Sequence, residues 1–164
     1  MLLSELVLSA LTDVILACVL FFLAGLSLRP GIQTFSPAWI WSLTLALIGL
    51  ASMLGAIDHG FFETIGHEAH RPLVIATRIV IVLGSLSMIV AASFQYLSSP
   101  LRQGFVAAGV LGALWPVFMI LTSDDFLSVI LYYSAGLIFL LVLSVVRFRQ
   151  NKGTLPMIAG IPLT

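Results

Sequence analysis

The sequence has very little charge. Only 9% of its 164 residues are charged and 60% are hydrophobic, whereas a soluble domain carries roughly 25% charged residues. A water-soluble fold of this length could not hide so much apolar surface, so we expect the solvent around most of the chain to be lipid. Seven basic residues balance seven acidic ones, which leaves no basic face for nucleic acid. The expected partner is therefore the lipid bilayer, and nucleic acid is excluded.

Cysteine is almost absent as well. Cys18 is the single cysteine, so neither an internal disulfide nor a Cys-x-x-Cys redox pair can form, and we interpret it as a small packing residue.

Basic residues are missing from the start of the chain. Residues 1–28 therefore lack the charged beginning of a cleaved signal peptide, and their apolar run exceeds the usual length of about 7–15 residues. This segment is predicted to be a retained helix.

Long apolar runs are what the sequence does contain. A helix needs about 20 apolar residues to cross the hydrocarbon core, and short connectors rich in proline, glycine and serine imply antiparallel neighbours. We predict a single all-α domain over residues 1–164, a polytopic membrane helix bundle with about five transmembrane helices. The predicted helices cover residues 5–28, 38–62, 73–97, 103–121 and 126–146. The tail, residues 154–164, is too short to span and is either interfacial or the start of an incomplete sixth helix.

The orientation follows from the basic residues near the helix ends, because cytoplasmic loops are enriched in Lys and Arg. Five basic residues fall on one side of the membrane, and they are Arg29, Arg102, Arg147, Arg149 and Lys152. On the other side only Arg71 falls in a loop, with Arg78 just inside the third helix. We therefore expect a multi-pass protein of the cell inner (plasma) membrane, with the N-terminus outside and the C-terminus in the cytoplasm.

Small residues are spaced for close helix contact in the fourth predicted helix. Gly104, Ala108 and Gly112 follow each other at intervals of four, and Gly109 and Ala113 repeat the interval alongside. Such spacing lets two helix backbones approach. Either the contact is intramolecular, or it is the seam of a homo-oligomer or of a complex with another membrane protein.

All seven acids and all three histidines lie toward the outer face under this topology. Asp13 stands about 10 Å along the first helix, at 1.5 Å per residue. A carboxylate within the membrane costs roughly 2.5–3.5 kcal/mol on insertion scales, so Asp13 should face the bundle interior. Arg78, a cation at similar depth, is its natural partner. The pair either fixes packing alone, or Asp13 serves as an interior ligand or proton acceptor.

The histidines offer a second focus. His59 shares a helix face with Ser52 and Gly55, which would leave room beside the imidazole. It is either an interfacial hydrogen-bonded histidine or a metal ligand or acid–base group. His67 and His70 are three residues apart, one short of the His-Glu-x-x-His zinc motif. They belong either to a solvated outer loop or to a metal site.

Two short motifs carry a resemblance. Leu11-Thr12-Asp13 and His59-Gly60-Phe61, followed by Arg78, resemble an uncharacterised bacterial family of multi-pass membrane proteins, which implies about seven helices. More loosely, the chain resembles the membrane hydrolases that include alkaline ceramidases and adiponectin receptors. That resemblance implies a zinc ion held by Asp and His. Those hydrolases place a His-x-x-x-His pair in the last helix, whereas this chain has no histidine after His70.

The preferred hypothesis is a zinc site on the outer face, built from Asp13, His59 and one or both of His67 and His70. Zinc with three protein ligands and a water generates a nucleophile near neutral pH. At the lipid boundary this would suit hydrolysis of a lipid amide or ester, with Arg78 holding a head group or an anionic intermediate. Asp13, His59 and Arg78 are thus the predicted catalytic residues. The alternative is a non-catalytic assembly or sensor component in which these three residues form a buried polar network.

Overall fold

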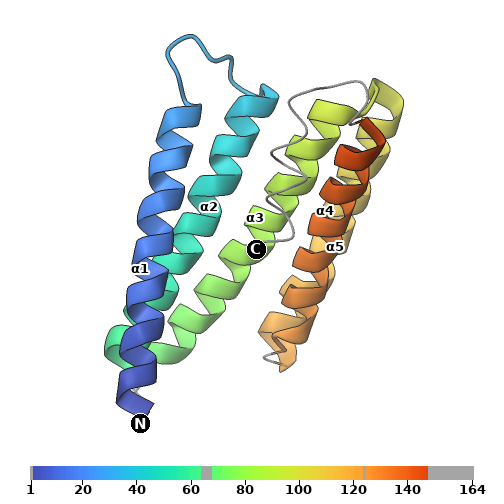
Figure 1. Ribbon diagram of the computed structural model, residues 1–164. Helices are drawn as coiled ribbons and strands as arrows, with labels where there is room; N and C mark the ends of the chain where they lie inside the picture. Colours follow the sequence, from blue (N-terminus) through green and yellow to red (C-terminus); the bar gives the residue numbers. More distant parts are fainter. Residues whose placement is uncertain (1, 64–67, 124, 148–164) are drawn as a thin grey trace.

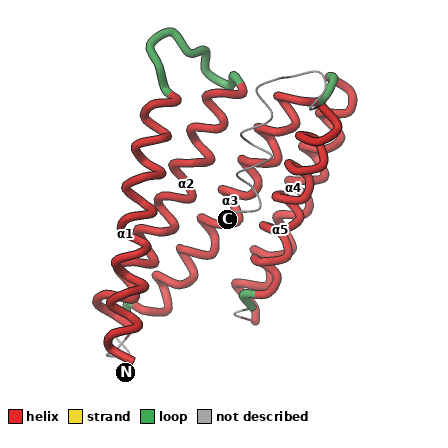
Figure 2. Tube along the Cα trace, in the orientation of Figure 1, coloured by secondary structure: helices red, strands yellow, loops and turns green. Residues whose placement is uncertain are grey.

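The computed structural model describes residues 2–63, 68–123 and 125–147. Within them, five helices are long and apolar enough to cross a membrane, and the short loops between them give an up-and-down bundle (Figure 2). The elements are α1 (Leu2–Ser27), α2 (Pro37–Ile57), η1 (Asp58–Phe62), α3 (His70–Tyr96), α4 (Ser99–Ser123) and α5 (Leu127–Arg147). The predicted all-α membrane bundle is confirmed. The tail 154–164 and His67 lie outside the described residues.

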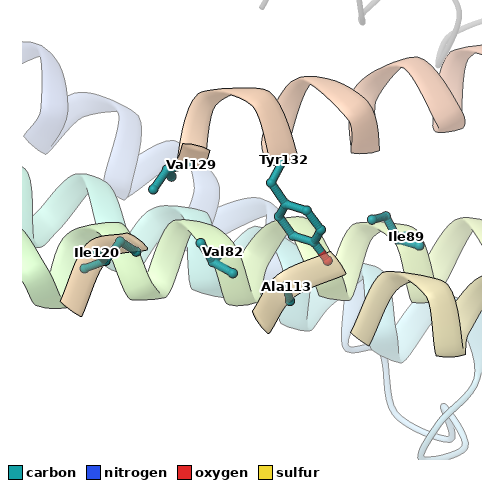
Figure 3. Close-up of a cluster of buried hydrophobic side chains, with 6 residues drawn as sticks. All are labelled: Val82, Ile89, Ala113, Ile120, Val129 and Tyr132. Carbon is teal, nitrogen blue, oxygen red and sulfur yellow. The ribbon is translucent and has the colours of Figure 1, made fainter. Parts of the chain in front are cut away.

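Helix α3 is the centre of the bundle. It runs diagonally between the α1–α2 pair and the α4–α5 pair (Figure 1), and it packs against α2, α4 and α5, whereas α1 packs against α2 and η1. The main apolar cluster lies where α3, α4 and α5 meet (Figure 3). Its buried members are Val82, Ile89, Ala113, Ile120, Val129 and Tyr132.

Local capping explains several helix boundaries. Ser36 caps α2, since its hydroxyl accepts a hydrogen bond from the Trp39 N–H at 3.3 Å, and Pro37 follows at the first helical position. Asp125 caps α5: its carboxylate accepts from the backbone N–H groups of Leu127 (3.1 Å) and Ser128 (3.0 Å). Caps of this kind satisfy donors that have no partner within their own helix.

Three predicted helices begin three or four residues earlier than expected, and the first of them is α1, which starts at Leu2 rather than at residue 5. Helix α3 starts at His70 rather than at residue 73, and α4 starts at Ser99 rather than at residue 103. Pro72 and Pro100 therefore lie inside the first turns, where the missing N–H of proline has no helical partner to lose. Placing His70 in the outer loop was wrong, because it is the first residue of α3.

Neutral polar pairs join α2 to α3 away from the acidic end. The Thr44 hydroxyl donates to Ser87 Oγ at 2.8 Å, and Trp41 Nε1 donates to Gln95 Oε1 at 2.7 Å. Hydrogen bonds between membrane helices fix their rotation as well as their distance. These contacts therefore fix the position of α2 relative to α3, and with it the relative position of the polar residues that lie at the outer ends of the two helices.

The small residues of α4 divide between two faces. Gly109 and Ala113 are buried, and a Cβ on Gly109 would lie 3.1 Å from Ile89 Cγ2 of α3. Gly104 and Ala108 are exposed. Intramolecular packing thus uses the Gly109–Ala113 repeat.

Candidate functional site

The acidic end of the bundle is built around a π-helical turn. The start of α1, η1, the beginning of α3 and the beginning of α5 lie at one end of the molecule (Figure 1). In η1 the Glu63 N–H donates to the Asp58 carbonyl, the i→i+5 bond that defines a π-helix. One ligand atom from each of Asp58, His59 and Glu63 lies within 4.8 Å of the other two. The turn therefore gathers three metal-ligating side chains from six consecutive residues.

His59 lies between two carboxylates. Its Nδ1 hydrogen-bonds to a carboxylate oxygen of Glu63, and its Nε2 faces Asp13 Oδ2 at 4.0 Å. The second distance is too long for a direct hydrogen bond. Two ligands of a tetrahedral zinc lie about 3.4 Å apart, so the two groups would have to approach each other slightly to hold one ion. A carboxylate on one imidazole nitrogen and an open position at the other is the arrangement found around metal-bound histidines.

Gly55 sets the position of Asp13. A Cβ on Gly55 would lie 3.1 Å from Asp13 Oδ2, so the missing side chain lets the carboxylate rest against α2. The Asp13 side chain is 30% exposed, as expected for a group that turns toward the bundle. Among the described ion pairs its partner is His59 rather than the predicted Arg78.

Asp58 and His70 connect η1 to α3. Asp58 Oδ1 lies 2.8 Å from His70 Nδ1, and the Asp58 side chain is only 6% exposed. A buried carboxylate needs such a partner. The imidazole of His70 remains partly open, since its side chain is 38% exposed.

A cavity of about 560 Å³ opens beside these residues. Its wall includes His59, His70, Arg71, Arg78 and Phe126. The guanidinium carbon of Arg78 lies 5.3 Å from the centre of the Phe126 ring, which places the cation on the aromatic face at the start of α5.

A second cavity, of about 360 Å³, continues toward the middle of the bundle. It shares Gly55, His59, Thr77, Ile81 and Phe126 with the first cavity. The two cavities therefore adjoin, and we call them together the outer groove.

The structure brings most of the predicted site residues to this groove. Asp13 and His59 face each other, and His70 and Arg78 line the outer cavity with His59. His67 is not among the described residues. These four described residues come from three elements, α1, η1 and α3, which meet at one end of the bundle.

Two acids of the cluster were missed. Glu63 could have been found, since it is four residues after His59, the spacing of helix neighbours. Asp58 could not, because adjacent residues of an α-helix point in different directions. The π-turn alone brings Asp58 and His59 into one cluster.

The fold and the site together define a polytopic helical membrane protein with a polar cluster at one end. Residues 8–164 match the family of unknown function DUF6962, and the chain belongs to that family. No curated protein and no solved structure matches the chain. The expected membership of an uncharacterised family is thus borne out, whereas nothing among the comparisons supports the likeness to ceramidases and adiponectin receptors.

Proposed function

We propose that the protein binds a zinc ion at the outer end of the bundle and acts as a metal-dependent membrane hydrolase. The observation that carries the proposal is the cluster of Asp58, His59 and Glu63, whose ligand atoms lie within 4.8 Å of one another. Asp13 faces the same histidine across a gap of 4.0 Å. Three protein ligands with one open position are typical of catalytic zinc.

The chemistry would be hydrolysis of an ester or amide. Zinc makes its bound water acidic enough to supply hydroxide near neutral pH. Zinc held by Asp58, His59 and Glu63 would supply this hydroxide to the carbonyl carbon. A carboxylate of the cluster would pass the water's proton to the alkoxide or amine that leaves when the C–O or C–N bond breaks. Arg78, on the wall of the same cavity, would stabilise the negative charge that develops on the carbonyl oxygen.

We also propose that the cluster faces the outside of the plasma membrane. The basic residues at the opposite end of the bundle support this orientation. A site at the boundary between lipid and water could receive a substrate from the outer leaflet.

A second candidate is a non-catalytic membrane component in which the cluster only fixes packing. Its support is that both described histidines already pair with carboxylates, His59 with Glu63 and His70 with Asp58. The second of these pairs would lock η1 to α3 without any metal. This candidate predicts that Asp58→Asn lowers stability and that zinc does not protect the fold.

Metal content distinguishes the two candidates. The parent protein, purified in detergent and supplied with zinc, is expected to hold near-stoichiometric metal. His59→Ala should lose it, and Glu63→Gln, which removes the charge of a second ligand of the cluster, should bind zinc at least 10-fold more weakly, since even the loss of an outer hydrogen-bond partner costs that much. Glu68→Gln, an exposed glutamate at the same end, is the matched control and should retain zinc. A His67/His70 double alanine variant tests the two remaining predicted ligands.

Absence of zinc from the parent would remove the metal proposal and leave the packing network. If zinc is present, fatty acid release from lipid esters and amides should follow metal content across these variants. A zinc-loaded parent that cleaves neither class of lipid would refute the hydrolase while keeping the metal site.

A further inference from the structure

We propose that the outer groove binds a single-chain membrane lipid with an anionic head group. The head group would lie at Arg71 and Arg78, and the acyl chain would run toward Ile48. The inference deepens the proposed function, on which it rests for the role of this lipid as the substrate of the zinc centre. The binding of the lipid itself depends only on the groove.

The groove changes from polar to apolar along its length, as a lipid does. The outer cavity is lined by six ionisable side chains, which are Asp58, His59, Glu63, His70, Arg71 and Arg78. The inner cavity keeps only His59 from that set and adds Asp13. The rest of its wall is uncharged, with the neutral polar side chains of Ser52, Thr77 and Tyr133 and the apolar residues Ile48, Ala51, Ile81, Phe126, Val129 and Ile130. A ligand that fills both cavities must be charged at one end and apolar at the other.

The depth of the groove fits one leaflet. Ile48 precedes His59 by eleven residues of nearly continuous helix, which is about 16 Å at 1.5 Å per residue. The hydrocarbon core of a bilayer is about 30 Å thick. The groove therefore runs from the outer boundary to about the middle of the membrane, the depth that an acyl chain of the outer leaflet occupies.

The head-group end carries two arginines on one face of α3. Arg71 and Arg78 are seven residues apart, so they stand two turns from each other on the same side, and both line the outer cavity. A guanidinium group pairs with a phosphate or carboxylate through two N–H groups. The two carboxylates on the same wall, Asp58 and Glu63, already pair with His70 and His59. This favours an anionic head group over a zwitterionic one.

Size and surroundings also favour a lipid over a helix. The inner cavity of about 360 Å³ is within the usual range for small-molecule sites, whereas a helix with its side chains is about 10–12 Å across. Side chains of α1, α2, α3 and α5 all contribute to its wall. An acyl chain there would fill space between the α1–α2 pair and α5.

The test measures binding of two fluorescent lipids with the same acyl chain, lysophosphatidic acid and lysophosphatidylcholine, to the full chain in uncharged detergent. The parent should bind the anionic lipid about 10-fold more tightly, equivalent to about 1.4 kcal/mol. Arg78→Gln should abolish this preference. Arg102→Gln is the matched control, because Arg102 also stacks on a phenylalanine, 4.5 Å from the Phe94 ring, but does not line the groove.

A second pair of variants tests the chain end. Ser52→Leu places bulk inside the groove and should weaken both lipids. Ala107→Leu adds bulk at an exposed position of α4 and should weaken neither. If Arg78→Gln fails to fold, Ser52→Leu and the head-group preference of the parent still decide the outcome.

Each measurement is repeated with zinc and with chelator, so that the two proposals can fail separately. Lipid binding that changes with the variants in the same way with zinc and with chelator supports the groove, while the zinc content of the parent decides the metal centre separately. Equal binding of the two lipids by the parent, or unchanged binding in Ser52→Leu, overturns the groove whatever the metal content.

Discussion

At the scale of single residues, Gly55 controls how close the Asp13 carboxylate comes to α2. Gly55→Ala would place a methyl group 3.1 Å from Asp13 Oδ2, a contact that forces the carboxylate to move by a few tenths of an ångström. Alanine also favours the helix by up to about 1 kcal/mol over glycine. We therefore expect thermal stability in detergent to be kept while zinc affinity falls ~10-fold.

Gly60→Ala serves as the control for this change. Its added Cβ would lie 3.7 Å from Ala10 Cβ, an ordinary van der Waals contact, and zinc affinity should stay at the parent value. Equal affinity in both variants would show that Asp13 does not contribute to the metal centre.

Tyr132 makes the buried hydrogen bond that joins α5 to α4. Its hydroxyl donates to the Gly109 carbonyl at 2.8 Å. Tyr132→Phe should lower the free energy of unfolding by about 0.6–1.5 kcal/mol, the scale of one such bond. Tyr133→Phe is the neighbouring control, since Tyr133 has no hydrogen bond within the described part of the chain. Chemical denaturation in mixed micelles would compare the two, and equal losses would contradict the assignment.

At the scale of elements, α4 presents one crowded and one open glycine. A Cβ on Gly109 would lie 3.1 Å from Ile89 Cγ2, whereas a Cβ on Gly104 would have no neighbour within 4 Å among the described residues. Gly109→Ala should therefore destabilise by about 1–2 kcal/mol, because overpacking against a stiff β-branched side chain exceeds the gain in helix propensity. Gly104→Ala should be neutral or slightly stabilising. If Gly104→Ala lowered the free energy of unfolding more than Gly109→Ala, the exposed face of α4 would have to pack against another helix, such as one from a second copy of the chain.

The π-turn is the element that makes the candidate site. It interrupts regular helix geometry directly after Ile57 and directs Asp58 to His70 while His59 faces Asp13. Such turns are rare and frequent at functional sites. Hydrophobic periodicity predicts a regular helix through this segment, so the sequence could place His59 and Asp13 but not the complete cluster.

At the scale of the whole molecule, one crossing of the membrane by α2 puts the α1–α2 loop and the α2–α3 connection on opposite membrane faces. In a Cys18→Ala background, Glu68→Cys should react with a membrane-impermeant thiol reagent in intact cells. Gln33→Cys, in the α1–α2 loop, should react only after lysis. The reverse pattern would place the acidic cluster on the cytoplasmic side and contradict the orientation predicted from the basic residues.

The sequence by itself determined the solvent, the helices and the end of the molecule where chemistry gathers. These depend on local composition: a run of about 20 apolar residues must cross the hydrocarbon core as a helix. Alternating spans then sort Asp13, His59 and Arg78 toward one face. Boundaries at Pro72 and Pro100 were displaced by a few residues, because proline is accepted within a first helical turn.

The tertiary structure alone decided which carboxylate meets which histidine. That choice depends on the rotation and tilt of each helix, which are set by contacts between distant segments. Examples are the close approach of Asp13 to Gly55, which has no side chain, and the Thr44–Ser87 hydrogen bond between α2 and α3. Composition does not reveal how each helix is rotated about its own axis, because the face that contacts lipid is as apolar as the face that packs against other helices. The groove between α2, α3 and α5 exists for the same reason: only the packing of the helices shows where they leave space.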